Sequence, residues 1–378
     1  MSASDYPSPP SLLITGIPGM PEDPMQRHEL ANGISQRGMV LLSANDASLL
    51  PEALWCFEKA IVLRRDLPLD ENVWFRWGLS AGWMNRGDVL TRMGKPELLD
   101  EAVRSYDEAL AQLEKMPLVE EPNKLGRHAL AWMNRAITLR AQRTPESLAE
   151  ALLSLDHARA LLEAHATAAQ PVDFQTLAML AMNRGALLLE VTPPQMLEAM
   201  DAAAEAAFLT QPLEKTELLG GEVALKARHV YCHAVAMLLE SPPVDARRAD
   251  GWIMQAAEWV EEAMGLTAWW ARKGHAFQEL RLELFHYGCR IYLAYQPQFM
   301  AEFLLDVLDP ERGSPLHAGA EDLHAAGLEA LAMAAEVLKR RGPLDFGLQK
   351  VDRLLEVIAS LNAAAERIKT LPRAEAAG

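Results

Sequence analysis

The sequence predicts an all-α protein, an α-solenoid of stacked antiparallel helix pairs with capping helices at its C-terminal end. The first observation is a repeat of 49 residues, in which WMNRG at 83–87 returns as WMNRA at 132–136 and AMNRG at 181–185. The second is that small and apolar residues in each repeat recur at helical spacings of three and four. The third is the lack of any β-type alternation or hairpin turn signal. A fixed period of this kind is typical of stacked repeats.

The first 27 residues are predicted to form an irregular segment. Six prolines lie between Pro7 and Pro24, and proline disrupts a regular helix. One hypothesis places residues 11–20, which hold the segment's apolar patch, in the groove of the array as an internal pseudo-ligand.

Five helix–turn–helix units are predicted over residues 28–266. In the second unit, Trp83, Gly87 and Leu90 form one stripe on the first helix. The second helix carries a matching stripe of Ala102, Tyr106 and Ala109. Small residues at such positions let two helices approach closely.

A repeated proline marks the break between the helices of a unit. In the third unit, Thr144 precedes Pro145, which predicts a helix start with threonine as the N-cap and proline at the first helical position. The prolines at this place recur with the period of the array: Pro96, Pro145, Pro194 and Pro243.

The period is lost after the fifth unit, and residues 267–370 are predicted to be a C-terminal helical cap. Terminal units of an array are normally atypical, because one of their faces meets water. A disordered tail is expected at 371–378. Helices are predicted in the cap at 275–293, 297–309, 318–341 and 345–369.

The composition limits the class of protein. A net charge of −16 and a pI near 5.1 argue against nucleic acid or an anionic membrane as partner. Three scattered cysteines do not form a disulfide framework. The N-terminus lacks the basic region of a secretory signal, and no apolar run is long enough to span a bilayer. The sequence predicts a soluble cytoplasmic protein.

These stripes resemble the tetratricopeptide repeat. That family places Trp, then Gly four residues later, then a large residue three later, and an Ala–aromatic–Ala stripe on the second helix, as at Trp83, Gly87 and Leu90 here. The usual repeat has 34 residues, so the repeat here is longer. The resemblance covers residues 28–266 and is strongest in the first three units. It implies an α-solenoid whose first helices line a concave groove for peptide segments of partner proteins.

An asparagine recurs at one position of three successive units. In tetratricopeptide arrays this position points into the groove, where an amide can bond both the N–H and the C=O of a peptide. Two alternatives are that these asparagines bridge neighbouring helices or were copied by duplication alone. The methionine before each asparagine either forms the floor of the groove or packs between helices. The predicted ligand-binding residues are Asn85, Asn134 and Asn183, with Gln36 and Tyr231 at the margins.

Arginines and acids also keep the period over four units, which predicts structural ion pairs. Two pairings fit, one within a unit, as in Arg86 with Asp107, and one between units, as in Glu58 with Arg86. Alternatively, an exposed Arg86 and Arg135 would hold a ligand carboxylate. The series comprises Arg37, Arg86, Arg135 and Arg184 with Glu58, Asp107, Asp156 and Glu205.

Few residues suggest catalysis. His229 and His233 have a spacing that can chelate a metal, but no second ligand cluster lies near them in the sequence, so no metal is predicted. No phosphate-binding glycine loop and no GxSxG motif occurs, and no cofactor is expected. A tryptophan cluster is interpreted as core or, alternatively, as an aromatic pocket at the end of the groove: Trp252, Trp259, Trp269 and Trp270.

Together these features predict a non-enzymatic scaffold that binds a peptide or protein segment in its groove. One alternative is a helical-repeat regulator that responds to a small ligand. Another is an accessory subunit of a biosynthetic enzyme.

Overall fold

The computed structural model describes residues 20–116, 122–164, 174–240, 246–318, 323–341 and 351–371. Over these ranges the chain forms fourteen α-helices and three short 3-10 helices, with no strand. The all-α prediction is confirmed. The chain divides into two compact units that meet at Thr176 and Leu177, in the first turn of α7. Each unit is described by itself.

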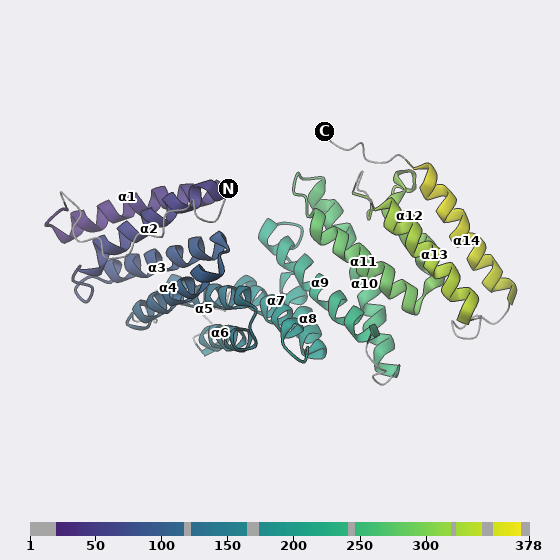
Figure 1. Ribbon diagram of the computed structural model, residues 1–378, viewed down its shortest axis with the longest axis horizontal. Helices are drawn as coiled ribbons and strands as arrows, with labels where there is room; N and C mark the ends of the chain where they lie inside the picture. Colours follow the sequence, from purple (N-terminus) through teal and green to yellow (C-terminus); the bar gives the residue numbers. More distant parts are fainter. Residues whose placement is uncertain are drawn as a thin grey trace. The chain divides into compact units, whose positions relative to one another are not determined.

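Unit 1 is a stack of three antiparallel helix pairs (Figure 1). Each helix packs against the next, and α3 also contacts α1 and α5. The first helices of successive pairs are therefore neighbours, as expected for a solenoid. The helices are α1 (Pro24–Ser43), α2 (Leu50–Arg65), α3 (Val73–Met93), α4 (Pro96–Glu114), α5 (Pro122–Gln142) and α6 (Pro145–Ala164).

Local capping explains where several helices of unit 1 begin. The predicted Thr144 cap is confirmed, since its Oγ1 accepts a hydrogen bond from the Ser147 backbone N–H at 3.1 Å. The predicted irregular segment 1–27 extends too far, because α1 already begins at Pro24. The Asp23 carboxylate accepts from the backbone N–H of Gln26, and proline is tolerated in a first helical turn.

A glycine on the first helix of a pair lets the two helices approach closely. A Cβ atom built on Gly87 would lie 2.8 Å from the Tyr106 ring, and one on Gly38 would lie 2.9 Å from the Phe57 ring. These pairs are one repeat apart, so the same glycine-on-aromatic contact closes α1 on α2 and α3 on α4. The close approach explains why the sequence keeps glycine in the interior of a helix, where it costs backbone entropy.

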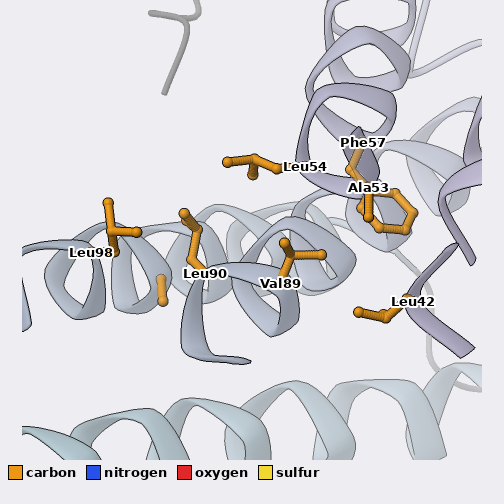
Figure 2. Packing of buried hydrophobic residues seen from close by; sticks show 8 residues of the cluster. Leu42, Ala53, Leu54, Phe57, Val89, Leu90 and Leu98 are labelled. Atoms are coloured by element: carbon orange, nitrogen blue, oxygen red, sulfur yellow. The ribbon is translucent and has the colours of Figure 1, made fainter. Parts of the chain in front are cut away.

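The core of unit 1 runs from one helix pair into the next. Figure 2 shows side chains from α1, α2, α3 and α4 meeting in one buried cluster. The members are Leu42, Ala53, Leu54, Phe57, Val89, Leu90, Leu98 and Ala102. Because each pair buries part of its apolar surface only against its neighbour, the repeats stabilise one another.

Unit 2 begins with the same packing and then departs from it. Alanines of α7 and α8 and residues of α9 form one buried cluster. Toward the C-terminal end, α11 contacts both α9 and α13, and α12 contacts α14. The helices are α7 (Phe174–Glu190), α8 (Met196–Thr210), α9 (Leu218–Glu240), α10 (Ala246–Ala271), α11 (Gln278–Tyr295), α12 (Met300–Leu308), α13 (His324–Arg341) and α14 (Val351–Thr370), with 3-10 turns at Ala47–Leu49, Pro297–Phe299 and Pro310–Arg312.

The expected junction between array and cap at 266 and 267 falls inside α10, which continues to Ala271. The division into two compact units lies at 176 and 177, within the expected array. The proposed pseudo-ligand at 11–20 lies, except for Met20, outside the described residues, as does 372–378 of the expected tail. None of the described helices has the length and apolar content needed to cross a membrane.

Candidate functional site

Asn85 on α3 and Asn134 on α5 lie on helices that touch each other. Met84 and Ala131 belong to one buried cluster, and the hydroxyl groups of Thr91 and Thr138 are 2.7 Å apart. Both asparagines are half-buried. Within the described part of the chain, neither side-chain amide makes a hydrogen bond. We call these two residues the amide pair.

Exposed apolar side chains flank one member of the amide pair. Leu130 and Ile137 lie one helical turn before and after Asn134, and their side chains are 39% and 40% exposed. The equivalent places on α3 are Ala81 and Asp88, both half-buried. α5 therefore presents an amide between two apolar side chains on one face. This arrangement can bond a backbone and contact the side chains next to it.

The other predicted ligand residues have different surroundings. Asn183, in unit 2, donates from Nδ2 to the backbone carbonyl of Met179 at 2.9 Å, one turn back in its own helix. Gln36 is exposed on α1. Tyr231 is 6% exposed, and its ring packs 4.5 Å from that of Trp259. Burial raises the pKa of Tyr231 to about 12.

The residues beside the asparagines pack in the core. The methionine that precedes each asparagine is buried, so it packs between helices and does not line an open surface. These residues are Met84, Met133 and Met182.

Arg86 lies at the centre of a buried polar network between two helix pairs. Its Nε donates to Glu58 on α2 at 3.1 Å, and its Nη1 donates to Ser105 on α4 at 2.8 Å. Its Nη2 donates to Glu101 on α4 at 2.8 Å. The guanidinium is buried, and burial raises the pKa of Glu58 against the opposing effect of Arg86.

Arg135 repeats this network one unit later. Its Nε donates to Asp107 at 2.7 Å, its Nη1 to Ser154 at 2.9 Å, and its Nη2 to Glu150. The acid again comes from the preceding pair, while the serine and glutamate come from the arginine's own pair. The observed partners are those of the between-unit pairing. Both guanidinium groups are occupied by protein, which leaves them poorly placed to hold a ligand carboxylate.

The serines and second glutamates of these networks were not singled out by sequence reasoning. Ser105 and Ser154 are one period apart, and so are Glu101 and Glu150. The repeat itself could have found them, because a buried guanidinium needs several acceptors to satisfy its donors.

The remaining members of the series are more varied. Arg37 pairs with Glu52 on the surface of unit 1. Arg184, Asp156 and Glu205 each take part in polar or electrostatic interactions as well. The arginine place of the fifth unit holds His233, whose ring stacks on Tyr287 at 5.2 Å.

The histidines of α9 form an aromatic and acidic cluster with α11. His229 Nε2 lies 2.5 Å from the Glu283 carboxylate, and its ring is 5.3 Å from that of Tyr287. Burial lowers the pKa of His229 and of His233, against the opposing charge of Glu283. No group of three or more potential metal ligands occurs in the described ranges.

Comparison with known proteins identifies no relative of this chain. Neither the protein-family models nor the curated proteins include a match to this chain. The likeness to the tetratricopeptide repeat therefore stays a prediction from the residues.

Proposed function

We propose that this protein is a non-enzymatic scaffold that binds an extended peptide or protein segment across α3 and α5. The observation that carries the proposal is the amide pair. Two half-buried amides on touching helices have no hydrogen-bond partner in the described residues. Asparagine is a poor residue in a helix interior, so two such residues without a structural bond favour a binding role.

The chemistry of the amide pair suits a peptide backbone. Each amide has one acceptor and two donors, so one side chain can accept from a peptide N–H and donate to a peptide C=O. Leu130 and Ile137 would contact the apolar side chains of the bound segment beside Asn134. Such binding would recognise mainly the peptide backbone and, to a lesser extent, its side chains. It agrees with the groove that the tetratricopeptide resemblance implies.

The proposal is tested with a displayed library of random peptides selected on the full-length protein. Peptides enriched on the wild type are synthesised, and their affinities are measured for Asn85→Ala/Asn134→Ala. We expect the double variant to bind at least tenfold more weakly, because each lost hydrogen bond contributes about 0.5–1.5 kcal/mol.

Two matched variants make the test specific. Asn362→Ala removes an exposed amide from α14, and Asn183→Ala removes one that is bonded within its own helix. Both are expected to bind the selected peptides as the wild type does. Equal affinity of the wild type and the double variant, with folding intact, would show that the amide pair does not bind peptide.

A further inference from the structure

One side of α1 carries the same residues as the side by which α3 packs on the preceding helix pair. Four residues are shared, and on each helix they follow one another at spacings of three and four, which places them on one face. They are Leu30, Gly33, Arg37 and Val40 on α1, and Leu79, Gly82, Arg86 and Val89 on α3. We call the four residues of α1 the α1 face.

On α3 the four shared residues are all buried, and they pack on α2. A Cβ atom on Gly82 would lie 3.0 Å from Ile61 Cγ1, and Arg86 donates to Glu58 at 3.1 Å. Val89 belongs to a core cluster that includes residues of α2. This set of residues therefore suits a helix that has a preceding helix to pack on.

On α1, at the outer end of the stack of unit 1 (Figure 1), the same residues are exposed. Leu30 and Val40 are 40% and 67% exposed. A Cβ atom on Gly33 would meet nothing within 4 Å. Glycine in a helix interior costs backbone entropy, and no contact within the described chain uses its small size here. The α1 face is therefore suited to packing on a further helix.

Arg37 also lacks a partner that its equivalent on α3 has. Within the described residues it pairs with Glu52 of its own helix pair. Arg86 has, in addition, Glu58 of the preceding pair, and the corresponding place one repeat earlier in the sequence is Pro9. A helix packed on the α1 face would complete the pattern if it brought an acid to Arg37.

We propose that this helix is α1 of a second copy of the chain, packed antiparallel about a two-fold axis at Gly33. The argument is charge complementarity. Glu29 and Arg37, both exposed, lie four residues before and four residues after Gly33. In an antiparallel pair centred there, Glu29 of each copy faces Arg37 of the other. A parallel pair would instead bring like charges together, which is unfavourable.

The contact is isologous, because the same surface serves both copies. Gly33 at the axis lets the two backbones approach, and the contact covers Leu30 and Val40 on its two sides. A single helix face per copy lies at the weak end of specific interfaces, which bury roughly 800 Å² per partner, so we expect a dissociation constant in the micromolar range. Unfolding measured below that concentration reports the separate chain, in which the α1 face is exposed. The inference does not depend on peptide binding, since the amide pair takes no part in the contact.

The first measurement is the mass of the full-length protein in solution, by sedimentation equilibrium from submicromolar to high micromolar concentration. We expect it to rise from the mass of one chain to that of two. Leu30→Glu/Val40→Glu puts charges into the apolar part of the contact and is expected to stay a single chain. Met39→Glu changes an exposed residue of α1 outside the face and is expected to dimerise as the wild type does. A wild type that is a single chain throughout would overturn the proposal.

Charge reversal tests the antiparallel arrangement. Glu29→Arg and Arg37→Glu each set like charges opposite one another, and each is expected to self-associate about tenfold more weakly than the wild type. An equimolar mixture of the two variants is expected to dimerise as the wild type does, because every acid again faces a base. Glu108→Arg, which reverses an exposed acid on α4, is the control. A mixture that associates no more strongly than either variant alone would contradict the proposed contact.

Other occupants of the α1 face would give different results. If residues 1–19 of the same chain cover it, the wild type is a single chain and Leu30→Glu/Val40→Glu lowers the free energy of unfolding. If a different protein binds there, the wild type is a single chain and this variant unfolds as the wild type does. Either result would overturn the assignment to a second copy.

Discussion

In unit 1, Arg86 and Arg135 each bind an acid of the preceding helix pair together with a serine and a glutamate of their own pair. In unit 2 the places that correspond to the serine and the glutamate beside Arg184 hold Ala203 and Ala199. The arginine place one unit later holds a histidine stacked on tyrosine. The acidic and serine partners thus recur with the period in unit 1, where a buried guanidinium needs hydrogen-bond acceptors. They are absent from the corresponding places of unit 2, where alanine or aromatic packing has replaced that network.

The asparagines differ between the units in the same way. The amides of Asn85 and Asn134 make no hydrogen bond within the described residues, whereas the Asn183 amide bonds to its own helix. One sequence pattern therefore has two physical roles, and the difference can be measured.

The largest effect is expected from removing a network arginine. Arg86→Met leaves Glu58, which is 3% exposed, without its cation. Breaking a buried pair in this way costs about 3–5 kcal/mol, measured as the free energy of unfolding in urea. Arg37→Met is the control, because that side chain is 65% exposed and exposed pairs contribute about 0–1 kcal/mol. Similar losses in the two variants would show that the buried network around Arg86 stabilises the protein no more than an exposed ion pair does.

The next effect tests the glycine-on-aromatic contact of unit 1. Gly87→Ala would place a Cβ 2.8 Å from the Tyr106 ring, and overpacking of this kind costs about 1–3 kcal/mol. Gly33→Ala on α1 meets nothing within 4 Å, so alanine should stabilise that helix by about 0.5–1 kcal/mol. The midpoint of thermal unfolding should therefore fall in Gly87→Ala and rise in Gly33→Ala, each relative to the wild type. If Gly87→Ala is more stable than the wild type, the Tyr106 ring can move aside at no cost in folding free energy.

The histidine cluster of unit 2 predicts a pH dependence. His229 and His233 have lowered pKa values in the fold, so below their ordinary value of 6.5 the unfolded chain binds more protons than the folded one. Their contribution to stability is present above that pH and is lost as the pH falls.

We therefore expect the wild type to lose more stability between pH 7.5 and 5.5 than His229→Gln/His233→Gln, measured by urea unfolding at each pH. His286→Gln, which changes an exposed histidine on α11, should follow the wild type. Parallel pH curves for the wild type and the double variant would rule out the cluster as the source.

The smallest effect distinguishes the open asparagines from the bonded one. Asn85→Ala and Asn134→Ala remove an amide with no described partner and gain helix propensity, so each should raise stability by about 0.5 kcal/mol. Asn183→Ala also loses the bond to Met179, so its gain should be smaller. Chemical denaturation of the three variants measures the order of their stabilities. If the first two destabilise the protein, the amide pair has a structural role after all.

The 49-residue period was enough to predict the helix pairs and the Thr144 cap of α6, because these depend on local spacing and capping. It could not choose between the two arginine pairings, since both keep the same period. It also could not find Ser105 and Glu101 as partners of Arg86, because the need for acceptors appears only once the guanidinium is known to be buried.

The sequence by itself determined the all-α class and the repeated stripes, because helical spacing and a fixed period are properties of the chain alone. Only the tertiary structure decided that Tyr231 is buried, that Asn183 bonds its own helix, and that Val40 on α1 is exposed while its equivalent on α3, Val89, is buried. The physical reason is that burial and partner identity depend on which helices pack together. Residues far apart in the sequence, such as Glu58 and Arg86, acquire their roles only through those contacts.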